Sequence, residues 1–179
     1  MNQLQEISPN QSKNLNEIDA IIEIPLNSKN KYELDKSGLM RLSRVLHTSF
    51  RYPFNYGFIP QTFCADNDAL DVVVISKEDF YPNTIVRIRP IGVLRVNDQG
   101  EVDDKILGVP IYEPEQNELK DLRDVPKHVL LEIKHFFTHY KDLEGKKVKV
   151  LGWNNSKFAK KIINSSLNLY KKRFKKQEK

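Results

Sequence analysis

Apolar and polar residues alternate in short segments from Ile18 onward, with turn-forming residues between them. Alternation with a period of two is typical of β-strands with one buried face. It predicts strands over "IDAIIEIPL" and "KYELD", and the intervening "NSKN" makes a hairpin the simplest arrangement of the two. Four more strands are predicted, over "LDVVVIS", "TIVRIRPIGVLRV", "DKILGVP" and "KVKVLGW".

The longest of these segments, residues 84–96, contains Pro90 and Gly92. Neither residue suits a regular strand interior, so we expect a bulge or a sharp bend there, as at the corner of a barrel. The sequence "NDQG" follows directly and predicts a turn into the next strand.

Helical periodicity replaces the alternation in two segments near the C-terminus. The first, residues 125–145, has a proline in its first turn and ends at Gly145. Its apolar stripe is predicted to contain Val129, Ile133, Phe136 or Phe137, and Tyr140. The second, residues 155–174, has Asn155 or Ser156 as its N-cap. Its apolar stripe is predicted to contain Phe158, Ile162 and Leu169.

These elements predict an α+β fold. Several short strands precede two helices, and strands outnumber crossover helices too strongly for a doubly wound sheet, so we expect a small β-barrel or strongly curved sheet with helices against it. The 179 residues suffice for one domain. We place that domain at residues 18–170, after a polar, loosely ordered segment at residues 1–17 and before a Lys-rich tail at residues 171–179.

The net charge of +5 raises the possibility of nucleic-acid binding. The last nine residues, "KKRFKKQEK", carry all of that excess, so residues 1–170 are neutral overall. We therefore expect no nucleic-acid partner. The apolar runs are too short to span a membrane, and the N-terminus lacks the pattern of a signal peptide. These features predict a cytoplasmic protein without a membrane partner.

Three aspartates, Asp66, Asp68 and Asp71, lie within six positions and lead into a row of valines. Carboxylates this close raise one another's pKa, and the valines draw the last of them toward the interior, where an unpaired charge is costly. A bound cation would explain the cluster, since Mg²⁺ and Ca²⁺ prefer carboxylate oxygens. An EF-hand is excluded because Lys77 stands where the loop needs glutamate. A solvated acidic turn is the alternative.

Other charged and phenolic residues could join this cluster in one cavity. Taken alone, the charged strand residues are compatible with a solvent-facing strand, the acidic turn with an exposed turn, and the aromatic segment with a packed loop. Lys, Arg and Tyr donors combined with metal ions would suit a polyphosphate, whose charge must be neutralised on several oxygens at once. The acidic candidates are Glu23, Glu33, Asp35, Asp98, Glu101, Asp103 and Asp104. The donors are Lys31, Arg44, Tyr52, Tyr56, Lys105, Tyr140 and Lys141.

The order and spacing of several motifs resemble the soluble, magnesium-dependent class I inorganic pyrophosphatases of the short prokaryotic type. The motifs are "IEIP", "KYE", an arginine before "YPFNYGFIP", "DNDALDVVV", "RPIGVLRVNDQGEVDDKILGVP" and "HFFTHYKDLEGKKVKVLGW", over residues 18–170. The resemblance implies a five-stranded OB-like closed β-barrel with flanking helices, two of them near the C-terminus. It also implies hydrolysis of pyrophosphate to two phosphates, Mg²⁺ as cofactor and a homohexamer.

The resemblance further implies roles for individual residues. Asp68 would be the base that activates water. The metal ligands would be Asp66, Asp71, Asp103, Asp98 and Glu23. The substrate would be held by Lys31, Arg44, Tyr56, Lys105, Tyr140 and Lys141, with Glu33 and Tyr52 in support. Two positions depart from the family pattern: Ala69 replaces a proline, and Gln99 replaces an acidic residue.

Two other functions remain open from the sequence. A barrel-fold nucleic-acid binder would use the aromatic residues and the basic tail, but it leaves the carboxylates unexplained. An inactive relative with a structural role is the other possibility, and the complete set of aspartates argues against it.

Overall fold

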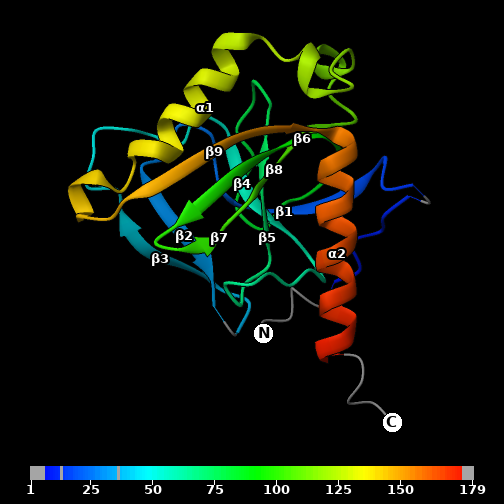
Figure 1. Ribbon diagram of the computed structural model, residues 1–179, viewed down its shortest axis with the longest axis horizontal. Coiled ribbons are helices and arrows are strands. Elements are labelled where there is room, and N and C mark those ends of the chain that lie inside the picture. Colours follow the sequence, from blue (N-terminus) through cyan, green and yellow to red (C-terminus); the bar gives the residue numbers. More distant parts are fainter. Residues whose placement is uncertain (1–6, 13, 36, 175–179) are drawn as a thin grey trace.

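The computed structural model describes residues 7–12, 14–35 and 37–174, which form an α+β fold with two helices against a sheet (Figure 1). The α+β class predicted from the pattern is confirmed. The strands are β1 (Ile18–Ile24), β2 (Asn30–Leu34), β3 (Met40–Val45), β4 (Asn55–Ile59), β5 (Leu70–Val74), β6 (Ile85–Asp98), β7 (Glu101–Val102), β8 (Lys105–Pro110) and β9 (Val148–Asn155).

Five strands of the larger sheet form a closed ring of pairings. β1 pairs antiparallel with β4 on one side and with β6 on the other. The ring continues from β4 through β5 and β8 back to β6. β5 and β8 run parallel, with Asp71 opposite Lys105, so two predicted site residues become neighbours. β7 and β9 extend the sheet from β6.

The hairpin predicted for residues 18–35 is wrong. β2 pairs with β3 in a separate two-stranded sheet, where Lys31 lies opposite Arg44. β1 has no free edge for β2, because β4 and β6 occupy both sides of it.

β4 was not predicted, because its "NYGFI" lies in an aromatic stretch interrupted by proline and glycine. The structure explains Gly57 within it. A Cβ atom on Gly57 would lie 1.9 Å from the carbonyl oxygen of Ile21, so only glycine lets β1 and β4 approach this closely.

The predicted bend in β6 is confirmed, since its pairing with β8 changes register between Pro90 and Gly92. The predicted turn at "NDQG" is also confirmed. Asp98 pairs with Glu101 across a two-residue loop, in which Gln99 and Gly100 both have positive φ. That backbone matches the strand twist of a tight hairpin.

Helix α1 (Lys127–His139) begins close to the predicted position but ends at His139, before the predicted Gly145. A 3₁₀ helix, η4 (Asp142–Glu144), follows it and ends at Gly145, whose φ is 71°. Two further 3₁₀ helices, η2 (Pro114–Gln116) and η3 (Leu122–Asp124), precede α1. The predicted apolar stripe is confirmed: its buried members are Ile133, Phe136, Phe137 and Tyr140.

Helix α2 (Ser156–Phe174) is capped as predicted, because Oδ1 of Asn155 accepts a hydrogen bond from the backbone N–H of Phe158 at 3.1 Å. Its predicted apolar stripe is confirmed only in part: Phe158 and Ile162 are partly buried against the core, whereas Leu169 is 47% exposed. The most buried positions lie one residue further along the chain than predicted, at Ala159 and Ile163. The residues that α2 buries are Ala159, Ile163, Ser166, Leu167 and Tyr170.

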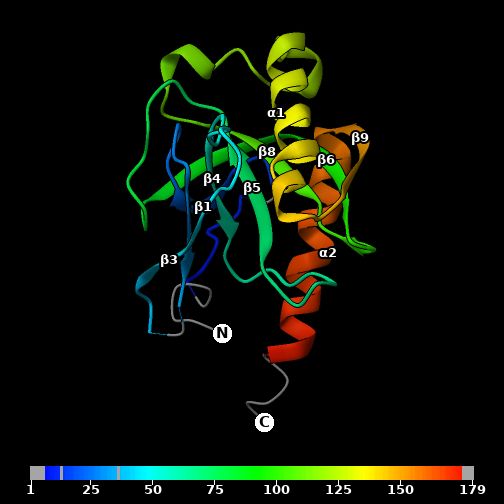
Figure 2. The same cartoon turned by 90° about the vertical axis from the view of Figure 1, so that its left-hand side faces the viewer.

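The core has two main layers, because alternate residues of each strand point to opposite faces. On β5, Val73 belongs to the layer that packs against α1, whereas Val72 and Val74 belong to the layer that packs against α2. Figures 1 and 2 show α2 running along the sheet, with its C-terminal turns extending past the strands.

None of the described helices is long and apolar enough to cross a membrane. The predicted N-terminal segment and C-terminal tail lie partly outside the described residues, at residues 1–6, 13 and 175–179. Their boundaries stay predictions.

Candidate active site

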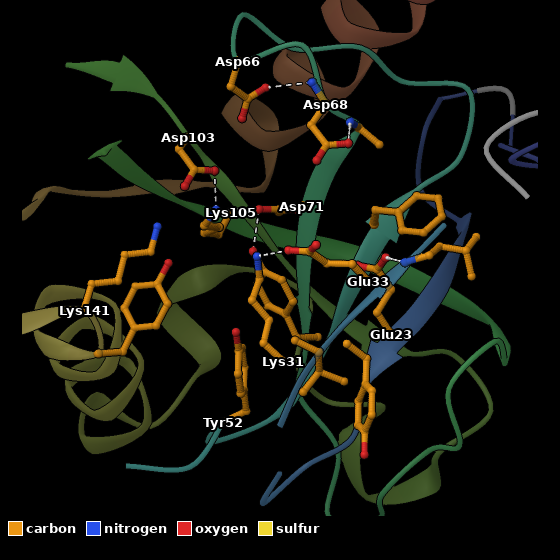
Figure 3. Close-up of a pocket in the computed structure, with 17 residues that line it drawn as sticks. Glu23, Lys31, Glu33, Tyr52, Asp66, Asp68, Asp71, Asp103, Lys105 and Lys141 are labelled. Carbon is orange, nitrogen blue, oxygen red and sulfur yellow. Dashed lines mark hydrogen bonds and ion pairs between the residues drawn. The ribbon is translucent and has the colours of Figure 1, made fainter. Parts of the chain in front are cut away.

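One cavity of about 270 Å³ is lined by all of the residues to which the family resemblance assigns a role, except Arg44 and Asp98. Side chains from β1, β2, β4, β5, β8 and the end of α1 converge on it (Figure 3). The predicted residues in its wall are Glu23, Lys31, Glu33, Tyr52, Tyr56, Asp66, Asp68, Asp71, Asp103, Lys105, Tyr140 and Lys141.

The loop between β4 and β5 presents Asp66 and Asp68 to this cavity. Asn67 lies between them with φ of 67°, a left-handed conformation that asparagine tolerates better than most residues. The carboxylate of Asp66 accepts the N–H of Asp68 at 3.1 Å, and that of Asp68 accepts the N–H of Ala69 at 2.8 Å. Each carboxylate keeps acceptor capacity for a ligand.

Lys105 is the buried cation of the site. Its ammonium group donates to Asp71 and to Asp103, although only 2% of its side chain is exposed. Burial alone would lower the pKa of Lys105, but these two carboxylates raise it above the ordinary value. Lys105 is therefore charged at neutral pH.

The aspartates around Lys105 are harder to ionise than exposed ones. Burial raises the pKa of Asp66, Asp68 and Asp103, and the negative charge of Asp71 raises each of them further. Lys105 opposes this increase in Asp103. The cavity thus holds more negative charge than its ammonium groups neutralise, an environment that favours binding of a cation.

Glu23 enters the cavity from β1, where it points away from the buried isoleucines. Burial raises the pKa of Glu23 to about 8, and the charges of Asp71 and Asp68 add to that increase. A hydrogen bond of 3.1 Å from the N–H of Leu34 opposes it. Without a cation nearby, Glu23 is mostly protonated at neutral pH.

Lys31 and Glu33 form an ion pair on β2. Glu33 is partly buried, which alone would raise its pKa, but Lys31 lowers it below the ordinary value. Asp35, on the same strand face in the prediction, instead pairs with Arg41 at 2.9 Å and does not line the cavity.

Three tyrosines close the cavity from the side of α1. Burial raises the pKa of Tyr52, Tyr56 and Tyr140 well above the usual value, so all three are neutral hydrogen-bond donors. The hydroxyl of Tyr56 donates to Asp71. Tyr140 stacks on Phe136 with 5.1 Å between ring centroids, which fixes its orientation.

Asp98 lines a neighbouring cavity with Gln99 and Glu101 rather than the main one. Asp66 and Asp103 border both cavities, so the two are adjacent. The ammonium group of Lys141, which lines the main cavity, donates to Asp98 in the neighbouring cavity.

Arg44 does not line the main cavity. Its Nε donates to Oε1 of Glu144 at 2.9 Å, and its buried Nη2 has no hydrogen-bond partner among the described residues. Glu144 was missed in the sequence, because it lies 100 positions from Arg44 and no local motif relates the two. Asp104 was grouped with the acidic turn, but it pairs with Arg95 at 2.8 Å instead.

The donor set suits a hard divalent cation such as Mg²⁺, because it consists of several carboxylate groups that converge on one cavity. Among the described residues, no three His, Cys, Asp or Glu side chains are already arranged around one point. Lys105 instead lies between Asp71 and Asp103. A cation would therefore require small side-chain movements.

Comparisons with known proteins agree with this geometry. The family model described as "Inorganic pyrophosphatase" matches residues 20–171. The chain belongs to the inorganic pyrophosphatase family. The soluble inorganic pyrophosphatase 2 of Chlamydomonas reinhardtii is 45% identical over 160 residues, which cover 89% of this chain and 83% of that protein. The inorganic pyrophosphatase of Geobacillus stearothermophilus is 41% identical over 154 residues, covering 86% and 93%.

Solved structures of inorganic pyrophosphatases show the same fold. The crystal structure of the enzyme from Thermus thermophilus has a TM-score of 0.90 and 37% identity, and the match covers 94% of this chain and 98% of that one. The family predicted from the motifs, and with it the prediction that the chain is an enzyme, are confirmed.

Proposed function

We propose that the chain hydrolyses inorganic pyrophosphate to two orthophosphates, with Mg²⁺ held by the carboxylates of the main cavity. The observation that carries this proposal is the arrangement of Asp66, Asp68, Asp71 and Asp103 around one cavity that also receives Lys105. Membership of the inorganic pyrophosphatase family supports it.

The carboxylates divide into metal ligands and a base. Asp66, Asp71 and Asp103 would hold one ion, with Asp71 shared with a second. Asp98 and Asp103 would hold an ion that enters with the substrate, and Glu23 another. Bound Mg²⁺ would lower the pKa of water and neutralise phosphate charge.

Asp68 is the proposed general base. Its carboxylate faces the cavity, and burial raises its pKa from the ordinary value, which strengthens it as a proton acceptor. Asp68 would take a proton from the water that attacks one phosphorus. The bond between that phosphorus and the bridging oxygen then breaks, and the second phosphate leaves with its electron pair.

The cationic and phenolic donors would bind the substrate. Their positive charge and hydrogen bonds would stabilise the additional charge on the departing phosphate. Glu33 and Tyr52 would orient these donors. The proposed substrate-binding residues are Lys31, Arg44, Tyr56, Lys105, Tyr140 and Lys141.

The proposal also covers the closure of the barrel, the bounds of the domain, the assembly and the cellular location. We infer that the ring of five strands is an OB-like closed barrel, because β1 and β6 join its two ends. We also propose a pyrophosphatase domain at residues 18–170, a homohexameric assembly and a cytoplasmic location.

The test is phosphate release from pyrophosphate by the purified protein, with Mg²⁺ and with EDTA. Asp68→Asn keeps the size of the side chain and should lower the rate by about 10²- to 10⁴-fold. Asp35→Asn is the matched control, because Asp35 pairs with Arg41 outside the cavity, and it should leave the rate unchanged. Absence of phosphate release by the unaltered protein with every divalent metal tested would refute the proposal.

A further inference from the structure

The loop at residues 64–69 carries two of the proposed site carboxylates without the rigidity of a helix or strand. It contains no proline, and Asn67 is held in a left-handed conformation. Its own hydrogen bonds are short-range, from the N–H of Cys64 to Asp68 O at 2.8 Å and from the N–H of Asn67 to Cys64 O at 3.2 Å. The orientation of the loop therefore depends on its support.

The C-terminal half of α2 provides that support. The backbone N–H of Phe63 donates to the carbonyl oxygen of Ser166 at 3.1 Å, and the Cys64 sulfur lies 3.5 Å from the Ser166 hydroxyl. About two helical turns further, the ring of Phe174 meets that of Phe63 edge-on, with 5.5 Å between centroids. The loop is thus attached to α2 at two levels.

Arg173 connects the last turn of α2 to the tip of the loop. Its guanidinium carbon lies 4.4 Å from the centroid of the Phe63 ring, within the range of a cation–π contact. Its Nη1 donates to Oδ1 of Asn67, at 3.4 Å. Arg173 thus contacts both the base of the loop and the residue between the two aspartates (see the position of α2 in Figure 2).

We propose that Arg173 is a positioning residue, which holds the loop of Asp66 and Asp68 in its metal-binding conformation from outside the cavity. The inference rests on the proposed function, since it assumes that Asp66 binds Mg²⁺ and that Asp68 activates the attacking water. Arg173 does not line the main cavity and is assigned no contact with substrate.

Removal of Arg173 affects Mg²⁺ binding through its charge and through its contacts with the loop, and these two effects have opposite signs. A positive group near carboxylates opposes Mg²⁺ binding electrostatically, so its removal would strengthen binding if charge alone mattered. Removal of a positioning contact weakens binding, because the free loop must be ordered when the ion binds.

The experiment measures Mg²⁺ binding to the full-length protein by isothermal titration calorimetry, without substrate. In Arg173→Ala, the dissociation constant should rise roughly two- to fivefold, the effect expected from loss of one exposed cation–π contact. Arg173→Lys keeps the charge but loses the planar group, so its dissociation constant should also rise, which an effect of charge alone would not produce.

Lys172→Ala is the matched control. It removes one charge from the same exposed turn, where the structure records no contact between Lys172 and the loop. Its dissociation constant should stay unchanged or fall slightly. The proposal would be overturned if the dissociation constant for Mg²⁺ rose equally in Lys172→Ala and Arg173→Ala. It would also be overturned if the constant in Arg173→Ala were unchanged or lower.

Hydrogen exchange provides a second readout, independent of metal and activity. In EDTA, the amides of Cys64 and Asn67 should exchange faster in Arg173→Ala, while those of β5 stay protected. Failure of the unaltered protein to bind Mg²⁺ would refute the proposed metal role instead, and the exchange result would still decide whether Arg173 holds the loop.

Discussion

Lys105 on β8 donates to both Asp71 on β5 and Asp103, from a side chain that is 2% exposed. The two carboxylates require a positive charge between them, because burial makes their uncompensated charge costly. The ammonium group of Lys105 supplies this positive charge.

Replacement of Lys105 by methionine should destabilise the metal-free protein. The substitution keeps an unbranched side chain but leaves Asp71 and Asp103 without their shared cation. We expect a loss of about 3 kcal/mol in the free energy of unfolding, measured by urea denaturation in EDTA at pH 7. Lys77→Met, which breaks an ion pair with exposed Glu115, should leave the free energy of unfolding nearly unchanged. Equal stability of Lys105→Met and the unaltered protein would contradict the expectation.

Glu23 should make the metal-free protein less stable as the pH rises. Its pKa is about 8 in the folded protein against 4.5 for the ordinary group, so the folded state retains a proton that the unfolded state has lost. Stability contributed by this group is therefore complete below about pH 4.5 and declines up to about pH 8.

Glu23→Gln removes this dependence. In EDTA, the melting temperature of the variant relative to the unaltered protein should increase between pH 5 and pH 8 and then level off. Other titrating groups are common to both proteins and cancel in the difference. Glu115→Gln, at an exposed position, is the control for loss of a carboxyl group outside the cavity. A flat difference for Glu23→Gln would show that burial does not raise the pKa of Glu23.

Glu144 should affect the binding of pyrophosphate, because it orients Arg44. Glu144→Gln weakens the ion pair that orients the guanidinium group, whose buried Nη2 has no partner among the described residues. We expect KM for pyrophosphate to rise about three- to tenfold with little change in kcat, because a ground-state contact is lost. Glu115→Gln serves as the control in steady-state assays. A fall in kcat at constant KM would contradict a role in binding.

The cap of α2 gives a prediction on stability alone. Asn155→Ala removes the acceptor for the N–H of Phe158 and should lower the free energy of unfolding by about 1 kcal/mol. Asn155→Ser retains a capping oxygen and should be close to the unaltered protein. Thermal denaturation distinguishes the two, and an equal loss in both variants would argue against capping as the cause.

The sequence predicted elements whose pattern is strong and local. Residues 125–145 have an apolar stripe and a terminal glycine, and α1 with η4 follows them closely. The bend at Pro90 and Gly92 was predictable because both residues disturb a strand. By contrast, β3 is partly exposed and β4 contains Gly57, so neither shows clear alternation.

Other features depended on contacts between distant parts of the chain. The pairing of β1 with β6 rather than β2 is determined by ring closure, which no local pattern encodes. The rotation of α2, which buries Ala159 and Ile163 completely, depends on packing against the sheet rather than on the local pattern.

In the candidate site, the cluster of Asp66, Asp68 and Asp71 was visible from spacing alone, whereas the individual roles came from family resemblance and remain proposals. The contact between Arg44 and Glu144 had no sequence signal.

The parallel pairing of β5 with β8 also bears on how the protein folds. Parallel neighbours cannot be joined by a tight turn, and here the long strand β6 lies between them in the sequence. Closing so large a loop is entropically unfavourable and slow. Asp71 and Lys105 face each other only after that closure, so an early collapsed chain would lack the assembled acidic cluster. The nascent protein should consequently acquire affinity for divalent ions late, in the same cooperative step that completes its sheet.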